Sequence, residues 1–218
     1  IGNDNVPFHA VIFPAMLMGQ ETYIMADHVV GNEYLNIFNR QTGQSEKGSK
    51  SRGNMISVRW AVDHLSTDAI RYYLCATAPE SKDADFDWDE FMNRYNGELC
   101  DVVGNFVHRC LTMTVKNFDG AVPAPGALEE PDQAMLDAIP RQLEAIEESL
   151  EGFKFRQALE RFIELGRKAN VYFDAMQPWA TRKTDITRTA TTLYTACQVV
   201  QALAYAMAPF LPEGAAKL

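Results

Sequence analysis

The chain has 218 residues, of which 47% are hydrophobic and 22% are charged. This length and composition are enough to bury a sizeable core in one large or two modest domains. The sequence contains no run of 18 apolar residues, and it starts without the basic and apolar regions of a signal peptide. We therefore expect a cytoplasmic protein with no membrane partner.

The formal net charge is −9, but the charges are unevenly distributed. Residues 129–151 contain eight acidic residues and one basic residue, whereas residues 152–190 contain eight basic and four acidic residues. The acidity is therefore a local face, and a basic patch for nucleic acid is compatible with the negative total.

Residues 1–58 contain short apolar runs broken by loops, at residues 10–13, 23–30 and 34–37. These runs predict strands and connectors of an α/β layer. A helix is expected to start at Pro14, because proline is tolerated in a first helical turn.

Residues 46–54 place positive side chains among small residues, in the order Glu-Lys-Gly-Ser-Lys-Ser-Arg-Gly-Asn. Phosphate recognition needs mobile positive charge and a backbone that comes close enough to donate N–H groups. Lys47 and Lys50 supply the charge, and the glycines and serines permit the approach. The pattern predicts a phosphate-binding loop, with an ordinary solvated loop as the alternative.

Residues 59–97 predict a connecting segment with two short helices, the second beginning at Asp68 with a capping residue nearby. Residues 83–91 then alternate acidic and aromatic side chains. This string suggests an acidic metal site, but it lacks the glycine-containing spacing of a calcium loop. The preferred interpretation is packing by its aromatic side chains, Phe86, Trp88 and Phe91.

From residue 98 the apolar residues recur with the i, i+3, i+4, i+7 spacing of buried helix faces. The first such stripe runs from Leu99 to Leu111, and further helices are predicted around residues 136–150, 155–173 and 186–207. Pro140 is expected to kink the second of the four helices. Short connections make an antiparallel bundle the expected arrangement.

Four cysteines lie far apart and form no Cys-x-x-Cys pair, which predicts neither a zinc site nor a disulfide framework. The helical spacing places Cys110 and Cys197 on core faces. We therefore expect free thiols in a reducing compartment.

Several motifs together resemble one family. Residues 47–51 resemble the Lys-Met-Ser-Lys-Ser signature of class I aminoacyl-tRNA synthetases, and Arg-Gly-Asn follows, as is usual there. Asn3 and Gly48 depart from the family, which usually has Lys and Met at these places. The neighbouring motifs occur in the order found in methionyl-tRNA synthetases: Ile-Gly-Asn-Asp at residues 1–4, Pro-Phe-His at 7–9, Pro-Ala-Met-Leu at 14–17, Gly-Asn-Glu-Tyr-Leu at 31–35, Ile-Arg-Tyr-Tyr-Leu at 70–74 and Gln-Pro-Trp at 177–179.

The resemblance implies an architecture: the C-terminal part of a Rossmann-like α/β catalytic domain over residues 1–58, a connecting segment over residues 59–97, and a mainly α-helical anticodon-binding bundle over residues 98–218. It implies ATP-dependent activation of methionine and its transfer to tRNA(Met), with ATP and its Mg²⁺ as substrate.

The chain starts at Ile1, within a motif, and none of its four histidines begins a His-Ile-Gly-His pattern. We therefore expect a fragment that is inactive alone. Its partner would be a missing N-terminal catalytic half, which would also carry any zinc, because this chain shows no metal site.

The resemblance also assigns an ATP site. Lys47 and Lys50 would hold the pyrophosphate as it leaves, with Ser49 and Ser51 beside them. Asp4 matches a position near the ribose, where a carboxylate accepts hydrogen bonds from sugar hydroxyls. The alternative for Asp4 is a turn residue.

Phe8 and His9 match residues that line the methionine pocket, which suits a thioether because it contacts aromatic edges and accepts one weak hydrogen bond. The alternative for His9 is a structural histidine. Asn105, Arg109 and Trp179 match the residues that meet the anticodon loop. Trp179 could instead be a lid on the bundle core.

Three other hypotheses remain open. Another class I synthetase would share the lysine loop but would not be expected to show both the Pro-Phe-His and Gln-Pro-Trp motifs. A stand-alone tRNA-binding module without catalysis would need only the bundle. A purely structural helical bundle would need neither the lysine loop nor a tRNA-binding surface.

Overall fold

The computed structural model describes residues 1–20, 22–49 and 53–218. The described residues fall into two compact units. Unit 1 comprises residues 1–63 and 77–88, and unit 2 comprises residues 64–76 and 89–218. The predicted connecting segment thus contributes to both units, and its boundaries at residues 58 and 97 stay predictions.

The first element of unit 1 is a continuous helical segment over residues 3–18. It consists of a 3₁₀ turn η1 (Asn3–Asn5), a π-helical stretch η2 (Phe8–Ile12) and the helix α1 (Phe13–Met18). The prediction of a strand or connector at residues 10–13 was therefore wrong, because a short apolar run by itself does not separate a strand from a helix. The expected helix exists, but it begins well before Pro14.

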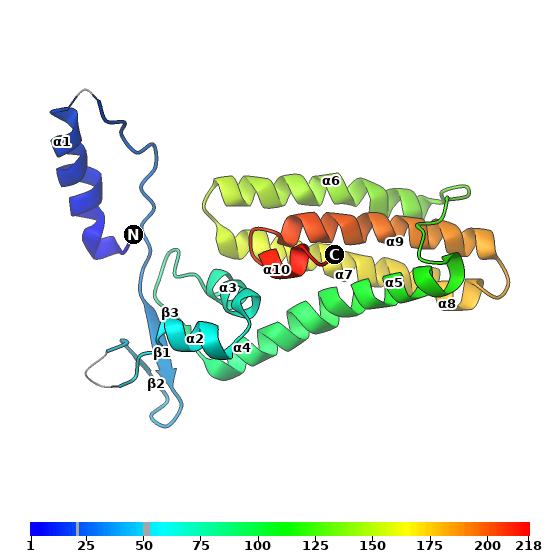
Figure 1. Cartoon of the computed structure of the whole chain (residues 1–218), viewed down its shortest axis with the longest axis horizontal. Helices are drawn as coiled ribbons and strands as arrows, with labels where there is room; N and C mark the ends of the chain where they lie inside the picture. The colour runs from blue at the N-terminus through cyan, green and yellow to red at the C-terminus, as the bar shows by residue number, and fades with distance from the viewer. Residues whose placement is uncertain (21, 50–52) are drawn as a thin grey trace. The chain divides into compact units, whose positions relative to one another are not determined.

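Unit 1 also contains a three-stranded mixed sheet in the order β2-β1-β3, drawn in Figure 1. Strand β1 (Leu35–Asn39) pairs antiparallel with β2 (Gln44–Glu46) and parallel with β3 (Ala84–Phe86). The strand predicted at residues 34–37 is confirmed, whereas residues 23–30, all described, form no strand.

The acidic and aromatic string at residues 83–91 serves packing and pairing. The rings of Phe86 and Trp88 meet edge to face at 4.8 Å between centroids, and Trp60 of helix α2 (Val58–His64) meets Trp88 at 6.0 Å. Asp87 accepts a hydrogen bond from Arg40 at 2.6 Å, and Asp85 accepts one from the Ser45 hydroxyl. The predicted packing is confirmed, and these carboxylates bind protein donors in unit 1.

Unit 2 is helical. Helix α3 (Thr67–Ala76) packs on α7 and α10, and α4 (Trp88–Arg94) continues through the π-helical stretch η3 (Tyr95–Gly104) into α5 (Asn105–Phe118). The remaining helices are α6 (Glu130–Glu151), α7 (Phe155–Met176), the single turn α8 (Pro178–Thr181), α9 (Ile186–Met207) and the short α10 (Pro212–Ala215). Figure 1 shows α5, α6, α7 and α9 running alongside one another. The predicted four-helix bundle is confirmed.

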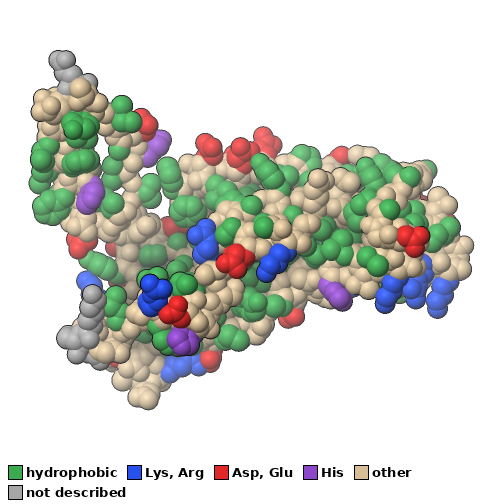
Figure 2. Space-filling model, in the orientation of Figure 1, with side chains coloured by type: hydrophobic (Ala, Val, Ile, Leu, Met, Phe, Trp, Pro, Cys, Tyr) green, Lys and Arg blue, Asp and Glu red, His purple; other side chains and the backbone are tan. Residues whose placement is uncertain are grey.

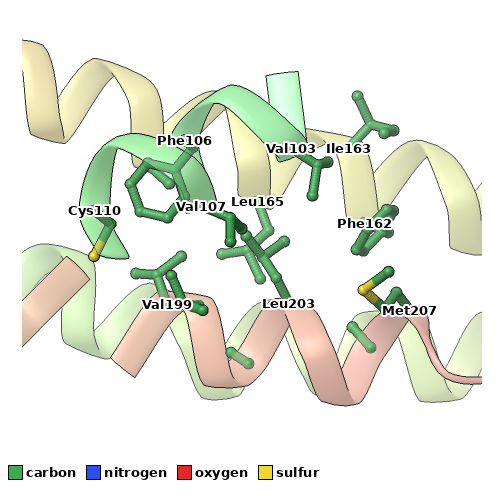
Figure 3. Close-up of a cluster of buried hydrophobic side chains, with 14 of the residues drawn as sticks. Val103, Phe106, Val107, Cys110, Phe162, Ile163, Leu165, Val199, Leu203 and Met207 are labelled. Atoms are coloured by element: carbon green, nitrogen blue, oxygen red, sulfur yellow. The ribbon is translucent and has the colours of Figure 1, made fainter. Parts of the chain in front are cut away.

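The core of the bundle lies where α5, α7 and α9 meet (Figure 3). Phe106, Phe162 and Leu203 are fully buried there. Cys110 and Cys197 are buried free thiols whose sulfur atoms lie 3.7 Å apart, so their predicted core positions are confirmed. Leu111 is the exception in the predicted stripe, because 40% of it is exposed.

A buried ion pair ties α6 to α7 and α9. The Asp132 carboxylate of α6 is fully buried and accepts two hydrogen bonds from the Arg188 guanidinium of α9, at 2.6 and 2.8 Å. It accepts a third from the Tyr172 hydroxyl of α7 at 2.6 Å and a fourth from the Glu129 backbone N–H at 2.8 Å. Each lone pair of the buried charge therefore meets a donor.

Candidate nucleotide and nucleic-acid sites

The predicted phosphate-binding loop leaves the sheet at the end of β2. Asn54 joins the two ends of this loop: its side-chain oxygen accepts from the Ser49 backbone N–H at 2.8 Å, and its amide donates to Glu46 at 3.0 Å. Glu46 also accepts from the Asn39 amide of β1 at 2.7 Å. The loop is thus anchored to the sheet at its base. Two predicted site residues lie outside the described residues: Lys50 and Ser51.

Two predicted ATP-site residues are brought together through a tyrosine. The Tyr34 hydroxyl donates a hydrogen bond to the Asp4 carboxylate at 2.8 Å, and the Lys47 ammonium lies 3.8 Å from the centroid of the Tyr34 ring. The hydrogen bond to the negative carboxylate raises the pKa of the Tyr34 phenol, because ionising it would place two negative charges together. Asp4 and Lys47 therefore flank one side chain.

The two residues predicted to line a methionine pocket lie on the N-terminal helical segment. Phe8 is 57% exposed. His9 contacts the Asn5 carbonyl through Nδ1 at 3.0 Å. Since a carbonyl only accepts, Nδ1 donates in this contact. The Asn5 side chain donates to Asp4 at 3.4 Å. The predicted ATP site and the predicted methionine pocket therefore both use side chains of the helical segment of residues 3–18.

In unit 2 the structure brings Arg109 and Trp179 into contact. The guanidinium carbon of Arg109 lies 5.1 Å from the centroid of the Trp179 ring and 5.2 Å from that of Phe173. Asp174 accepts a hydrogen bond from the same guanidinium at 2.6 Å. Arg109 of α5 is thereby held against α7 and α8 by two rings and one carboxylate.

The reversal between α7 and α8 explains how Trp179 reaches Arg109. Gln177 adopts the left-handed backbone conformation, with φ 45° and ψ 56°, and Pro178 starts α8 in the next position. Trp179 follows with 39% of its surface exposed and its ring 6.1 Å from that of Phe173. The side chain thus touches the core and also reaches solvent.

Asn105 is exposed at the start of α5, one turn before Arg109, so both project from the same side of the helix. Exposed Arg182 and Lys183 follow α8. In Figure 2, Lys and Arg side chains gather at the end of the bundle that carries α8, whereas Asp and Glu side chains follow α6. This end of the bundle offers an aromatic ring, an amide and positive charge.

Sequence reasoning missed four residues of these sites: Tyr34, Asn54, Phe173 and Asp174. Tyr34 and Asn54 fall inside motifs that the sequence displays, but a motif does not say which of its members touch. Phe173 and Asp174 lie on a different helix from Arg109, and only the packing of α5 on α7 reveals their contacts.

Within residues 1–20, 22–49 and 53–218, no group of three or more His, Cys, Asp or Glu side chains is placed to hold a metal ion. No helix in the same described part of the chain has the length and apolar character needed to span a bilayer.

Two family models match the chain. Residues 1–111 match the model described as tRNA synthetases class I (M), and residues 122–218 match the anticodon binding domain of methionyl tRNA ligase. The first match covers the sheet and lysine loop, and the second covers most of the bundle.

Individual relatives agree. The chain is 41% identical over 223 residues to the methionine–tRNA ligase of Porphyromonas gingivalis and 40% identical over 227 residues to that of Pyrococcus horikoshii. Each alignment covers all of this chain but only 32% and 31% of those proteins. The chain therefore spans about a third of the length of the curated relatives it matches.

Solved structures agree as well. The methionyl-tRNA synthetase of Mycobacterium tuberculosis bound by methionyl-adenylate matches with a TM-score of 0.89 and 32% identity, over 99% of this chain and 42% of that one. The free form of the same enzyme matches with a TM-score of 0.85 and 32% identity, over all of this chain and 41% of that one.

The mixed sheet with its lysine loop, followed by a helical bundle, defines the class as class I tRNA synthetases. Within that class the chain belongs to the methionyl-tRNA synthetase family, and it corresponds to the end of the catalytic domain together with the anticodon-binding domain.

Proposed function

We propose that the chain is the part of a methionine–tRNA ligase that holds the phosphates of ATP and reads the anticodon of tRNA(Met). The observation that carries this proposal is the order of the two family matches along one chain, the class I synthetase model followed by the anticodon-binding model. The contacts within each unit indicate which residues carry out each of these two functions.

The nucleotide is held by residues of unit 1. Asp4 accepts from the ribose hydroxyls, and the two loop lysines, Lys47 and Lys50, stabilise the pyrophosphate of Mg²⁺-bound ATP as it leaves, with Ser49 and Ser51 beside them. At an effective dielectric near 20, one lysine about 4 Å from a phosphate charge gains roughly 4 kcal/mol. Such a gain accelerates the reaction only to the extent that it is larger in the transition state than in the ground state.

Methionine binds beside the nucleotide. The exposed Phe8 ring offers apolar surface to the thioether, and His9 lies in the next position of the same π-helical stretch. The M. tuberculosis relative, which is bound by methionyl-adenylate, supports a joint amino-acid and adenylate site in this family.

The anticodon is read by the face that carries Asn105, Arg109 and Trp179. Unpaired bases in an RNA loop are recognised by stacking on aromatic rings and by hydrogen bonds to their edges. Trp179 offers a partly exposed ring, Asn105 a paired donor and acceptor, and Arg109 a guanidinium that Asp174 already orients. Transfer of methionine to tRNA(Met) requires this face in addition to the nucleotide site.

The remaining part of the catalytic domain is the proposed protein partner of unit 1. The helical segment of residues 3–18 exposes a set of large apolar side chains, which offer a surface for that part: Phe8, Val11, Ile12, Phe13, Met16 and Met18. We propose that the rest of the ATP site, and any zinc, belongs to the remaining two thirds of the relatives' length. We also propose that the enzyme is cytoplasmic, with domain limits at residues 58 and 97.

The lysine loop supplies the test. In the complete protein, Lys50→Ala is expected to slow methionyl-adenylate formation by at least about a hundredfold, if its charge interaction develops mainly in the transition state. The dissociation constant of methionine should change less than about threefold. Stopped-flow activation kinetics measure the first quantity, and equilibrium titration measures the second.

The matched control is Lys154→Ala, which removes an exposed lysine from unit 2 and should leave both quantities unchanged. An unchanged activation rate in Lys50→Ala would contradict the proposed catalytic role of the loop. If the complete protein binds tRNA(Met) but never forms the adenylate, the stand-alone tRNA-binding module is the better account. The 218-residue chain alone is expected to show no methionine-dependent ATP–pyrophosphate exchange.

A further inference from the structure

Tyr34 lies outside the strands, but both of its backbone hydrogen-bonding groups are paired. Its backbone N–H donates to the Asp83 carboxylate at 3.0 Å, and its carbonyl accepts from the Ala84 N–H at 3.0 Å. These bonds align Tyr34 with the start of β3, directly before the parallel pair of Leu35 with Ala84. The side chain therefore projects from a backbone that the sheet defines.

The Tyr34 side chain uses its two chemically different parts on two different partners. Its hydroxyl donates to the Asp4 carboxylate at 2.8 Å, and its ring face lies 3.8 Å from the Lys47 ammonium. A ring face attracts a cation because its quadrupole is negative there, and a hydroxyl donates to a carboxylate. One side chain thus holds an acidic and a basic residue in a fixed relation.

We propose that Tyr34 is a positioning residue of the nucleotide site, which orients Asp4 toward the ribose and retains the Lys47 ammonium beside it until phosphate arrives. This inference rests on the proposed function and adds to it a residue with two separable roles. The hydroxyl acts through Asp4, and the ring acts through Lys47.

The physical need for such a residue comes from Lys47 itself. A lysine has four side-chain torsions, so a loop lysine in solvent samples many positions, and binding it to one place costs up to about 2 kcal/mol of rotamer entropy. Gly48, the next residue, offers no side chain to anchor the loop. Contact with the Tyr34 ring restricts the ammonium before ATP binds, and an anionic phosphate, a stronger partner for a cation than a ring, can then draw it away.

Two substitutions separate the roles in the complete enzyme. Tyr34→Phe keeps the ring and removes the hydroxyl, whereas Tyr34→Leu removes both. Tyr34→Phe is expected to raise the KM for ATP about fivefold to tenfold with kcat of ATP–pyrophosphate exchange within twofold of wild type, because a ribose contact is shared by ground and transition states. Tyr34→Leu should show the same rise in KM and an additional threefold to fivefold loss in kcat.

Double-mutant cycles decide whether Tyr34 acts through its neighbours. In a Lys47→Ala background, Tyr34→Leu should cause no further loss in kcat. In an Asp4→Asn background, Tyr34→Phe should cause no further rise in the KM for ATP. A purely structural role would instead lower the melting temperature and multiply the separate effects in both backgrounds.

Three results would overturn the inference in an active enzyme. The first is equal kinetics of Tyr34→Phe and Tyr34→Leu, and the second is full additivity in either cycle. The third is a faster reaction in Tyr34→Leu, which would show that the ring competes with phosphate for Lys47. A wild-type complete protein without any exchange activity would instead refute the proposed function, and the role of Tyr34 would fall with it. The wild-type measurement therefore distinguishes the two failures.

Discussion

Trp179 combines two environments in one side chain. Its ring contacts the fully buried Phe173 on one hand and the guanidinium of Arg109 on the other, yet 39% of its surface remains exposed. A residue that served only as a core lid would be expected to bury nearly all of its ring, and a residue used only for stacking would not need the contact with Phe173. The contacts therefore support a ring that the core orients for use at the surface.

Trp179→Ala in the complete enzyme is expected to raise the apparent KM for tRNA(Met) about fivefold to a hundredfold, because base stacking on an aromatic ring contributes roughly 1 to 3 kcal/mol. ATP–pyrophosphate exchange should stay nearly intact, because the residues of the proposed nucleotide site belong to unit 1, whereas Trp179 belongs to unit 2. Aminoacylation kinetics, exchange kinetics and a thermal melt measure the three properties.

Trp179→Phe is the matched control, since it keeps a stacking ring at the same position and should recover much of the tRNA affinity. A fall of many degrees in melting temperature, with exchange and aminoacylation impaired equally, would identify Trp179 as a core lid. In that case the stacking role would be wrong, while the Arg109 and Asn105 assignments could still be tested separately.

At the scale of the helices, the buried Asp132 determines how α6 joins the bundle. Burial by itself would raise the pKa of this carboxyl, but the hydrogen bonds from Arg188 and Tyr172 outweigh the burial, so its pKa is lowered. A carboxylate whose folded pKa is depressed contributes stability above the unfolded pKa, near about 3.9, and loses it as pH falls through the folded value.

Asp132→Asn should therefore lower the free energy of unfolding of the bundle by about 3 to 5 kcal/mol at pH 7, because Arg188 is left without its buried counter-charge. The difference from wild type should persist at pH 5 and be smaller at pH 3, because below about 3.9 the carboxyl of the unfolded wild-type chain binds a proton. Denaturant unfolding followed by helical circular dichroism at the three pH values measures this.

Asp137→Asn on the same helix provides the comparison. Asp137 is exposed, and its carboxylate accepts a hydrogen bond from the Gln133 amide one turn earlier at 2.7 Å. Replacing it should therefore change the free energy of unfolding by no more than about 0.5 kcal/mol at each pH. A pH-independent deficit in Asp132→Asn would show that shape, and not charge, explains its effect.

The helices of the bundle could be predicted from sequence because each carries a sustained apolar period of more than three turns. The elements of unit 1 were less predictable. Residues 10–13 form part of a helix and residues 23–30 form no strand, although both are apolar runs, because four to eight residues do not establish a period. Strand β3 escaped prediction because its three residues depend on pairing with β1, which lies about 50 residues earlier.

Among the site residues, sequence motifs could identify members but not contacts. The family resemblance assigned Asn105 and Arg109, and helical spacing adds that both project from the same face of the helix. The contact of Arg109 with Trp179 depends on the left-handed Gln177 and on the packing of α5 against α7, and neither has a local signature. The assigned roles of these residues stay predictions.

At the scale of the whole molecule, the charge of −9 and a proposed polyanionic partner are reconciled by unequal distribution. Acidic side chains follow α6, while basic side chains gather at the end of the bundle near α8 (Figure 2). RNA phosphates would be attracted to the second region and repelled by the first, so we expect this charge distribution to orient the proposed tRNA partner toward the face of Arg109 and Trp179.

Two lysines, one before α7 and one after α8, allow this expectation to be tested with the same substitution at each place. Lys183 follows α8, which comes directly after α7, and Lys154 precedes the first residue of α7; the helix between them has 22 residues and is about 33 Å long. If Lys183 contacts phosphate, Lys183→Gln should reduce the slope of log affinity against log salt by about 0.7 to 0.9. Lys154→Gln, with the same loss of charge, should leave the slope unchanged.

Fluorescence anisotropy with labelled tRNA(Met) between 50 and 200 mM salt is the measurement, repeated with a tRNA whose anticodon has been replaced. Lys183→Gln should weaken binding to both RNAs by the same factor, because phosphate contacts carry no sequence information. Trp179→Ala should mainly weaken binding to the cognate RNA. Equal slopes for the two lysine variants would contradict local phosphate contact at α8 and would mean that only the total charge of the molecule governs the salt dependence.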